Sequence, residues 1–369
     1  MDEVRVELGE RSYDIVIGTG ALGELGRRMA ALGAGGRALL VTNPEINRLY
    51  GEKVRAALSG AGLRAEAFEF PEGEEQKRLA TIMRAYDHLI EGNYSRSTVI
   101  VALGGGVVGD MAGFVAATYM RGVHFVQIPT TLLAMVDSSV GGKTGVNHPL
   151  AKNMIGAFYQ PRLVVADLDT LRSLPPKEFR AGYAEVVKTA VIWDAAMFEF
   201  LEANREAIFA LAPEPLAYVV RRSCEIKAEV VSRDEREADL RAILNFGHTF
   251  GHALEALTEY GEFVHGEAVS VGMVAAARTA ERLGMLDAAS RERIESHLAA
   301  AGLPTRFPAS IAIDAFLARF SKDKKAIEGA IRFVLPDRIG HVVVRGDVPL
   351  DLIRGVINDM RESPGEERR

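Results

Sequence analysis

The sequence predicts two domains: an α/β domain with a mostly parallel sheet, followed by an all-α domain. The chain has 369 residues, more than the roughly 250 to 300 at which a single hydrophobic core stops growing. Its first half alternates Val/Ile/Leu-rich runs with amphipathic stretches, the order typical of a parallel sheet. After Pro175 and Pro176 helical periodicity takes over, which places the domains at 1–176 and 177–369.

Individual elements follow from the same patterns. Between the strands of the first domain, segments 50–61 and 76–90 have the helical period. In the second half, segment 330–344 is the exception, because it alternates like a hairpin with Pro336 and Gly340 near its turn. The candidate strands of the first domain are the apolar runs 37–43, 97–103, 123–129 and 162–168.

Composition excludes several classes of function. A formal charge of -6 gives no basic field for a nucleic-acid partner. The longest apolar passages, 97–109 and 122–136, are shorter than the roughly 20 residues of a spanning helix, so no membrane partner is expected. The first residues lack the basic and apolar regions of a secretory signal, and we expect a cytoplasmic location. Because Cys224 is the single cysteine, a zinc site would need imidazole and carboxylate ligands.

A glycine-rich turn follows the strongest candidate strand. Residues 104–110, GGGVVGD, satisfy the pattern G-x-G-x-x-G through Gly104, Gly106 and Gly109. Glycine lets the backbone approach a pyrophosphate, and the N–H groups of the next helix start supply positive charge. The acidic residue that binds the ribose about 20 residues later in the dinucleotide fingerprint has no counterpart here. Two interpretations stay open: a nucleotide site whose ribose contact comes from elsewhere, or a tight turn without a ligand.

A second glycine-rich run spans 137–153. Its GKT at 142–144 resembles a phosphate loop, but a Walker A motif requires glycine where Asp137 stands, which excludes a nucleoside triphosphatase. Ammonium groups in such a polar stretch could bind a phosphorylated or carboxylated ligand. The alternative is an ordinary solvated loop. The candidate groups in this run are Asp137, Lys143, Lys152 and Asn153.

A polar stripe runs through the apolar segment 240–257. Its members recur at spacings of four, three and four, which predicts one face of one helix lining an internal cleft. His248 and His252 have metalloprotease spacing, but Thr249 stands where H-E-x-x-H requires glutamate, so a zincin is disfavoured. The four members are Arg241, Asn245, His248 and His252.

A metal site could combine one carboxylate with two imidazoles. Glu185 and Lys188 lie one helical turn apart, and His265 begins another apolar helical run. Glu185, His265 and one of the two earlier histidines would leave a coordination position open, as in a catalytic zinc site. The spacing does not choose between His248 and His252, and buried histidines are also often only hydrogen-bonded.

Three further cations have a simpler interpretation as well. Arg121, Lys227 and Lys324 lie in charged surroundings that are typical of solvated surface, or of helix-face ion pairs that contribute little.

Taken together, the ordered motifs between Val41 and Lys325 resemble those of the 3-dehydroquinate synthase family, which belongs to the sugar phosphate cyclases. The resemblance implies that fold, with a nucleotide-binding α/β domain and a helical metal-binding domain. It also implies NAD, zinc or cobalt, a homodimer and a phosphorylated sugar acid as substrate. The motifs are PEGEEQK, GGGVVGDMAGFVAATYMRG, IPTTLLAMVDSSVGGKTGVN, KNMIGAFYQP, AGYAEVVK, LNFGHTFGHALE and HGEAVSVGM.

The resemblance also implies roles for individual residues. The metal ligands would be Glu185, His248 and His265, and His252 would serve as a proton relay or phosphate contact. The NAD contacts would be Asn43, Glu74, Lys77, Gly105, Gly106, Val107, Val108, Gly109, Asp110, Thr130, Thr131, Thr170, Leu171, Arg172 and Ser173, together with Lys143 and Lys152. Around the substrate phosphate would lie Lys143, Asn153, Asn245, His252 and Lys324, with Arg121 from a neighbouring subunit. Lys227 and Arg241 would bind the carboxylate, and Asp137 and Lys188 would orient the reacting hydroxyls.

Three rival functions remain at this point. Another sugar phosphate cyclase would share the architecture but act on a different sugar. A metal-dependent polyol or glycerol dehydrogenase would have no need of so many lysines directed at phosphate. A non-enzymatic binding protein would leave the buried glutamate and histidines unexplained.

Overall fold

The computed structural model describes residues 1–33, 36–237, 239–258, 263–326 and 331–361, without the side chains of 321–326. Its internal contacts divide the chain into two compact units: unit 1 comprises 1–175 and 210–236, and unit 2 comprises 176–209 and 237–369. Helix α8 (Pro213–Arg233) belongs to unit 1, where it packs on β1, β2 and η6. The assignment of 1–176 to nucleotide binding and 177–369 to metal binding stays a prediction.

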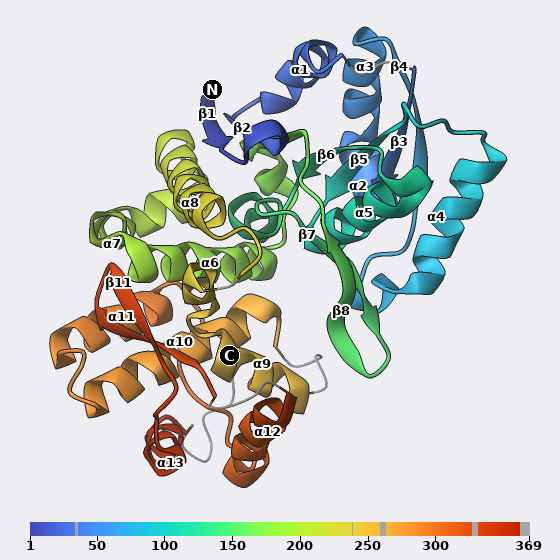
Figure 1. Ribbon diagram of the computed structural model, residues 1–369. Coiled ribbons are helices and arrows are strands. Elements are labelled where there is room, and N and C mark those ends of the chain that lie inside the picture. The colour runs from blue at the N-terminus through green and yellow to red at the C-terminus, as the bar shows by residue number, and fades with distance from the viewer. Residues whose placement is uncertain (34–35, 238, 259–262, 327–330, 362–369) are drawn as a thin grey trace. The chain divides into compact units, whose positions relative to one another are not determined.

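A seven-stranded sheet forms the centre of unit 1, in the order β1-β2-β9-β6-β5-β3-β4 (Figure 1). All neighbouring strands are parallel except β1 and β2, so the predicted mostly parallel sheet is confirmed. The strands are β1 (Asp2–Val6), β2 (Tyr13–Gly18), β3 (Gly36–Thr42), β4 (Leu63–Glu69), β5 (Val99–Gly104), β6 (His124–Pro129) and β9 (Leu163–Asp167).

Helices cover both faces of this sheet. Alternate residues of β5 enter two cores, since Val99, Val101 and Leu103 belong to one cluster and Ile100 and Ala102 to the other. Burial on both faces explains why these strands are continuous apolar runs rather than alternating ones. The first cluster includes residues of α1 (Leu25–Ala31) and α3 (Glu52–Gly60), and the second those of α4 (Leu79–Glu91) and α5 (Gly106–Thr118).

The glycine-rich run after β6 is more ordered than a loop. After the π-helical turn η6 (Ala134–Ser138), strands β7 (Lys143–His148) and β8 (Ala151–Phe158) pair as an antiparallel hairpin. Gly145 and Gly156 face each other in this pairing, and a Cβ on either would come within 2.4 Å or less of the opposite strand's backbone. The sequence of β8 shows no strand pattern, because its apolar and polar residues do not alternate and all of them are exposed or half-buried.

Unit 2 is mainly helical, with one hairpin, as its sequence predicts. Helix α6 is buried along most of its length, in accordance with its apolar sequence. None of the described helices is both long and apolar enough to span a bilayer. The elements are α6 (Pro176–Trp193), α7 (Ala195–Phe209), η8 (Leu240–Asn245), α9 (His248–Leu257), α10 (His265–Arg282), α11 (Ala288–Ala300), α12 (Ile313–Ala326), β10 (Phe333–Arg338), β11 (His341–Arg345) and α13 (Leu350–Asp359).

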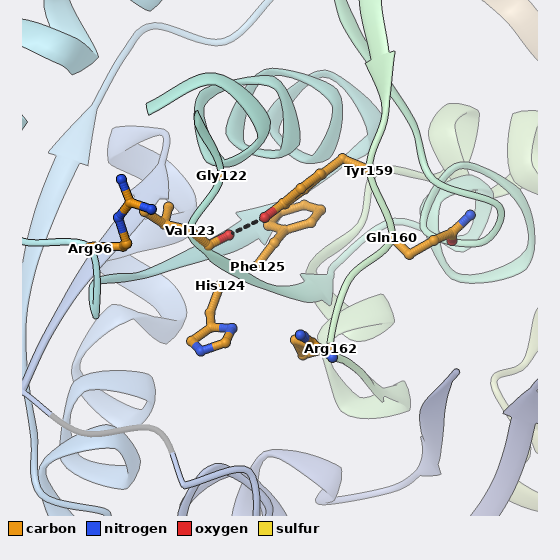
Figure 2. Close-up of a pocket in the computed structure, with 8 residues that line it drawn as sticks. All are labelled: Arg96, Gly122, Val123, His124, Phe125, Tyr159, Gln160 and Arg162. Carbon is orange, nitrogen blue, oxygen red and sulfur yellow. Dashed lines mark hydrogen bonds between the residues drawn. The ribbon is translucent and has the colours of Figure 1, made fainter. Parts of the chain in front are cut away.

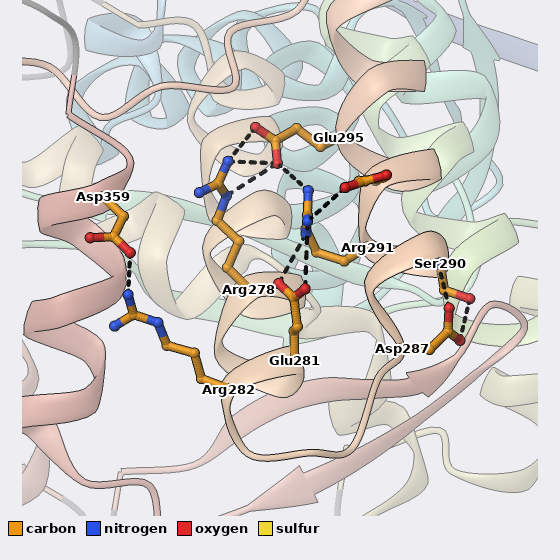
Figure 3. A network of polar contacts seen from close by, with 9 residues as sticks. Arg278, Glu281, Arg282, Asp287, Ser290, Arg291, Glu295 and Asp359 are labelled. Carbon is orange, nitrogen blue, oxygen red and sulfur yellow. Dashed lines mark hydrogen bonds and ion pairs between the residues drawn. The ribbon is translucent and has the colours of Figure 1, made fainter.

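Ion pairs join α10 to α11 (Figure 3). The Arg278 guanidinium donates to both oxygens of Glu295, at 3.1 Å through Nε and 2.7 Å through Nη2. Arg291 Nε donates to Glu281 Oε2 at 3.0 Å. Bidentate pairs of this kind are the stronger class of charged hydrogen bonds, and they fix the half of α10 that lies away from His265.

The expectation of one helix face for Arg241, Asn245, His248 and His252 is wrong. Arg241 and Asn245 lie in the 3-10 helix η8, whereas the two histidines lie in α9. Between them Gly247 has φ of 79°, a left-handed conformation that favours glycine. The regular spacing in the sequence therefore spans two helices of different axis.

Candidate active site

In unit 1, the carboxyl ends of β3 and β5 are neighbours at the point where the strand order reverses. The chain leaves β3 toward β4 but leaves β5 toward β6, on the other side. Val41 pairs with Ala102, so Asn43 and the glycine turn after Gly104 follow adjacent strand ends. Open α/β sheets bind their ligands at such a switch point.

The glycine turn links β5 directly to α5. Gly104 has φ of 157° and ends the strand, and Gly105 precedes the first helical residue, Gly106. A Cβ on Gly105 would lie 3.1 Å from Thr131, and one on Gly106 would lie 3.1 Å from Ser138. The turn is thus tightly packed, with the N–H groups of the first turn of α5 unpaired by the helix itself, an arrangement suited to an anionic ligand.

Thr130 follows β6 at the same edge of the sheet. Its backbone N–H donates to the carbonyl of Gly104 at 3.0 Å, which ties the ends of β5 and β6 together. Its hydroxyl oxygen is buried and has no hydrogen-bond partner among the described residues. Buried hydroxyls are ordinarily paired, so this group fits a contact to a ligand.

A polar network around the buried Lys77 joins three of the predicted residues. Lys77 is 6% exposed, and its ammonium donates to Asp110 Oδ2 and to Asn153 Oδ1, both at 2.6 Å. Burial raises the pKa of Asp110, while the nearby Lys77 charge opposes that shift. Beside it, Asn147 donates to Glu74 Oε1 at 2.7 Å. Asn153, predicted for the phosphate, therefore lies with the residues predicted for NAD.

The remaining predicted NAD residues have structural partners. Asn43 caps α2 (Pro44–Ile46) by accepting from the Ile46 N–H at 2.8 Å. The Tyr50 hydroxyl lies 2.7 Å from Ser173 Oγ and donates to the Thr170 carbonyl. Leu171 and Arg172 lie in the same short 3-10 helix, η7 (Leu168–Ser173).

Lys227 of α8 points to Asp137 and not along its own helix. Its ammonium donates to Asp137 Oδ1 at 2.6 Å and to the Asp137 carbonyl at 2.5 Å, and it is 7% exposed. The interpretation of Lys227 as a weak helix-face pair is therefore wrong. Lys143 is exposed at the start of β7, and Lys152 is half-buried in β8.

Arg121 lies in a strained segment. Met120, Arg121 and Gly122 have φ of 49°, 68° and 122° in succession, the first two in the left-handed region where side chains are disfavoured. Such strain concentrates at functional sites, and the Arg121 side chain is exposed.

In unit 2, Glu185, His248 and His265 converge from α6, α9 and α10. Glu185 Oε1 lies 3.6 Å from His248 Nε2 and 3.5 Å from His265 Nε2. Ligands at about 2.1 Å from a tetrahedral zinc ion lie about 3.4 Å from each other. Both carboxylate oxygens of Glu185 are buried without a geometrically acceptable hydrogen bond among the described residues, although Lys188 forms an ion pair with Oε2. The three groups therefore fit a divalent cation.

The charges at this trio favour a bound cation. Burial would raise the pKa of Glu185, but Lys188 and the two imidazoles hold that pKa well below its usual value. Burial lowers the pKa of His248 to about 3. Burial also tends to lower the pKa of His265, but the adjacent carboxylates of Glu185 and Glu255 outweigh burial and raise that pKa to about 10. Glu185 is thus ionised and His248 neutral at pH 7, the forms that bind metal, whereas His265 has to release a proton when a cation binds.

Glycines bring α9 and α10 close enough for their histidines to meet. A Cβ on Gly272 would lie 2.0 Å from the Gly247 carbonyl oxygen, and one on Gly251 would lie 3.1 Å from that of Ala268. The His248 and His265 ring centroids are 5.3 Å apart. We call Gly247, Gly251 and Gly272 the glycine seam.

The other predicted residues of unit 2 are placed as follows. Lys188 and Arg241 are each 2% exposed, so both cations are buried. Asn245 donates to Glu237 Oε1 at 3.0 Å. His252 is exposed, with its ring centroid 5.3 Å from that of His248. Lys324 lies in α12, but its side chain is outside the described residues.

Sequence reasoning missed Glu255, which is 7% exposed and lies 3.4 Å from His265 Nδ1. Its signal was a position on the same helical face as His248 and His252, seven and three residues later. A second set of candidate ligand atoms within 4.8 Å of one another consists of His252, Glu255 and His265.

A cavity of about 250 Å³ in unit 1 lies elsewhere (Figure 2). It opens at the amino ends of β6 and β9, where Val123 and Arg162 precede these strands. None of the predicted nucleotide or substrate residues lines it. Its lining residues are Arg96, Gly122, Val123, His124, Phe125, Tyr159, Gln160 and Arg162.

Two family models match adjacent segments of the chain. Residues 67–181 match the family model described as 3-dehydroquinate synthase N-terminal, and residues 182–326 match 3-dehydroquinate synthase C-terminal. The chain belongs to the 3-dehydroquinate synthase family. A member of this family from Picosynechococcus sp. is 51% identical over 355 residues, which cover 96% of this chain and 97% of that protein.

Solved structures of other cyclases have the same fold. The 2-epi-5-epi-valiolone synthase of Streptomyces hygroscopicus subsp. jinggangensis, with NAD+ and Zn2+ bound, has a TM-score of 0.87 and 29% identity, covering 96% of this chain and 98% of that one. A 2-deoxy-scyllo-inosose synthase complexed with carbaglucose-6-phosphate, NAD+ and Co2+ has a TM-score of 0.88 and 27% identity, covering 97% and 100%. The predicted fold class is therefore confirmed.

Proposed function

We propose that this protein is a 3-dehydroquinate synthase. It converts 3-deoxy-arabino-heptulosonate 7-phosphate to 3-dehydroquinate and inorganic phosphate, a step of the shikimate pathway. The observation that carries the proposal is the convergence of Glu185, His248 and His265 in a chain that is 51% identical to a 3-dehydroquinate synthase over nearly its whole length. The two cyclases with other products are 27% and 29% identical.

The reaction is redox-neutral overall. Oxidation of the C5 hydroxyl makes a ketone, which acidifies the C6 proton and allows phosphate to leave by elimination. Reduction of the ketone, ring opening and an intramolecular aldol closure then give the carbocycle. Bound NAD supplies the hydride acceptor and returns the same hydride, so it is not consumed.

Unit 1 supplies the nucleotide contacts in this proposal. The N–H groups at the start of α5 receive the pyrophosphate. The Thr130 hydroxyl, buried and unpaired within the described part of the chain, donates to the nucleotide. Asn43 and Gly105 follow neighbouring strand ends, so they offer contacts on both sides of the switch point. The network around Lys77 and Asp110 holds the first turn of α5 in place.

Unit 2 supplies the metal ligands in this proposal. Glu185, His248 and His265 hold a zinc or cobalt ion, which as a Lewis acid polarises the substrate's hydroxyl and carbonyl oxygens when bound. Lys188 lies beside Glu185 as a buried cation and stabilises negative charge that develops on the substrate. His252, exposed beside His248, serves as the proton relay.

The substrate carries a phosphate and a carboxylate, so an acidic protein has to concentrate cations locally. Arg241 and Lys227 are buried cations suited to the carboxylate. Asp137 accepts from Lys227, which fixes that ammonium and leaves the carboxylate of Asp137 to orient a substrate hydroxyl. The residues proposed around the phosphate are Lys143, Lys152, Asn153, Asn245, His252 and Lys324.

A homodimer and a cytoplasmic location complete the proposal. The strained backbone at Arg121 supports a role for this exposed side chain in the site of a second copy. Sedimentation of the wild-type protein should give a dimer, and mixing Arg121→Ala with an inactive His248→Ala variant should restore part of the activity through mixed dimers. Cell fractionation tests the location.

The deciding experiment supplies the heptulosonate phosphate with zinc and an amount of NAD far below that of the substrate. Inorganic phosphate and 3-dehydroquinate should form together over many turnovers per NAD. Stoichiometric NADH without phosphate would instead identify a polyol dehydrogenase. Phosphate release only from a different sugar phosphate would identify another cyclase.

Two variants test the proposed residues. His248→Ala should lose bound zinc and activity together, and chelation of the wild-type protein should have the same effect. Lys152→Ala should lower turnover while leaving the unfolding midpoint unchanged. Arg64→Ala, on the exposed side of the edge strand β4, is the matched control and should keep wild-type kinetics. Wild-type kinetics in Lys152→Ala would remove that lysine from the site.

A further inference from the structure

Glu255 is a buried carboxylate on α9 that the proposed reaction does not use. It is 7% exposed, and its Oε2 lies 3.4 Å from Nδ1 of His265, across from the first turn of α10. Burying a carboxylate is costly unless it is paired and hydrogen-bonded. Its place beside an imidazole therefore calls for an explanation.

The His265 ring has a carboxylate at each nitrogen. Nδ1 faces Glu255, whereas Nε2 lies 3.5 Å from Glu185 Oε1. His248 repeats the arrangement with a backbone acceptor, because its Nδ1 lies 3.1 Å from the Phe246 carbonyl and its Nε2 lies 3.6 Å from Glu185 Oε1. In both rings, Nδ1 is turned to an acceptor and Nε2 to Glu185.

We infer that Glu255 is a positioning residue for His265: its carboxylate accepts the Nδ1 proton, which leaves the Nε2 lone pair directed at the cation site beside Glu185. An acceptor at the far nitrogen fixes the tautomer and ring orientation of a metal-binding histidine and raises its basicity. The inference deepens the proposed function and rests on its metal site.

A different role would make Glu255 itself a ligand, together with His252 and His265, whose ligand atoms also lie within 4.8 Å of one another. The burial of the side chains and their hydrogen bonding argue against Glu255 as a ligand. The carboxylate with two buried oxygens that lack an acceptable hydrogen bond is Glu185, and neither oxygen of Glu255 shares that condition among the described residues. His252 is exposed, whereas Glu185 is buried and His248 is half-buried.

The test measures metal binding directly. Zinc affinity is determined by competition with a chromophoric chelator, and the cobalt-substituted protein is examined by its visible d–d absorption. Glu255→Gln keeps the shape and one acceptor oxygen but removes the charge, and Glu255→Ala removes the acceptor. We expect affinity to fall about 10-fold in the first and up to about 100-fold in the second, with a changed cobalt spectrum in both.

Glu267→Gln is the matched control, because Glu267 lies at the start of α10, the helix of His265, and accepts from the Val264 N–H at 3.1 Å. Among the described residues it is not paired with an imidazole. It should keep zinc affinity within about twofold. Urea unfolding of the metal-free variants confirms that each is folded.

Three results would overturn the inference. Glu255→Gln could bind zinc with the wild-type affinity and show the wild-type absorption spectrum with cobalt. Zinc binding could be lost altogether in Glu255→Gln, together with a lower coordination number of cobalt, which would make Glu255 a ligand. Glu267→Gln could weaken binding equally, which would assign the effect to the placement of α10. Failure of the proposed reaction would be seen separately, since affinity and spectra are measured without substrate.

Discussion

Replacing Gly272 by alanine tests whether the glycine seam positions the metal ligands. The added methyl would lie 2.0 Å from the carbonyl oxygen of Gly247, which directly precedes His248. An ordinary contact requires the two helices to separate by about 1 Å or more. Because Gly247 and His248 are consecutive, the imidazole has to move with the carbonyl.

The expected change in the free energy of unfolding follows from two opposed effects. Alanine is favoured over glycine inside a helix by about 1 kcal/mol, whereas overpacking a tight contact costs about 1 to 3 kcal/mol. The clash at Gly272 is with backbone, which has no rotamer to relieve it, so we expect a net loss of about 2 kcal/mol. A displacement of this size should also weaken zinc binding at least about 10-fold, since ligand sets tolerate misplacement of only about 0.5 Å.

The assay combines urea unfolding of the metal-free protein with zinc competition. Gly60→Ala is the matched control, because Gly60 ends helix α3 and a Cβ there meets nothing within 4 Å. It should keep wild-type zinc affinity and lose no stability. If Gly272→Ala unfolds at the wild-type midpoint and binds zinc within twofold of the wild type, close approach of the helices does not determine the site.

Three further predictions concern stability. Burial lowers the pKa of His297 to about 4, below the unfolded value of about 6.5, so the stability present above about pH 6.5 is lost as the pH falls toward 4. We expect the free energy of unfolding to be about 2 kcal/mol lower at pH 5 than at pH 8, and His297→Gln should reduce this difference in urea melts. Glu295→Gln, which leaves the half-buried Arg278 without its bidentate partner, should cost about 1 to 2 kcal/mol by the same measurement, and an unchanged midpoint would contradict it. Lys77→Met should cost about 2 kcal/mol at pH 7 by removing the cation beside the half-buried Asp110. Asp110→Asn added to it should recover part of that loss, and strictly additive effects would show that the pair is not coupled.

The strands that the sequence predicted are those covered on both faces. Val99, Val101 and Leu103 point into one core and Ile100 and Ala102 into the other, so the whole run is apolar and easily recognised. The β7–β8 hairpin was not predicted, because glycines and polar residues interrupt its apolar positions, of which Val146 and Ile155 pack into a core. Backbone pairing, which the composition does not show, holds it together.

The candidate site could be predicted only as a set of residue types. Periodicity placed His248 and His252 on one helix with Arg241, but Gly247 breaks that helix, and the regular spacing of the four residues continues across the break by coincidence. The sequence could not choose between the two histidines, since the choice depends on which imidazole faces Glu185. That geometry arises from the close approach of α9 and α10, which is possible because Gly251 and Gly272 have no side chain at the contact.

Helix α8 separates Glu185 from His248 in sequence, yet it packs on β1, β2 and η6 of unit 1. During translation Glu185 is synthesised first, then α8, the last helix of unit 1, and only afterwards His248 and His265. Nascent domains fold from the amino terminus as their segments emerge. The chain thus has every element of unit 1 before the proposed metal ligands are all synthesised. A truncated product released after α8 would therefore carry the whole sheet but lack two of the three residues proposed to bind zinc.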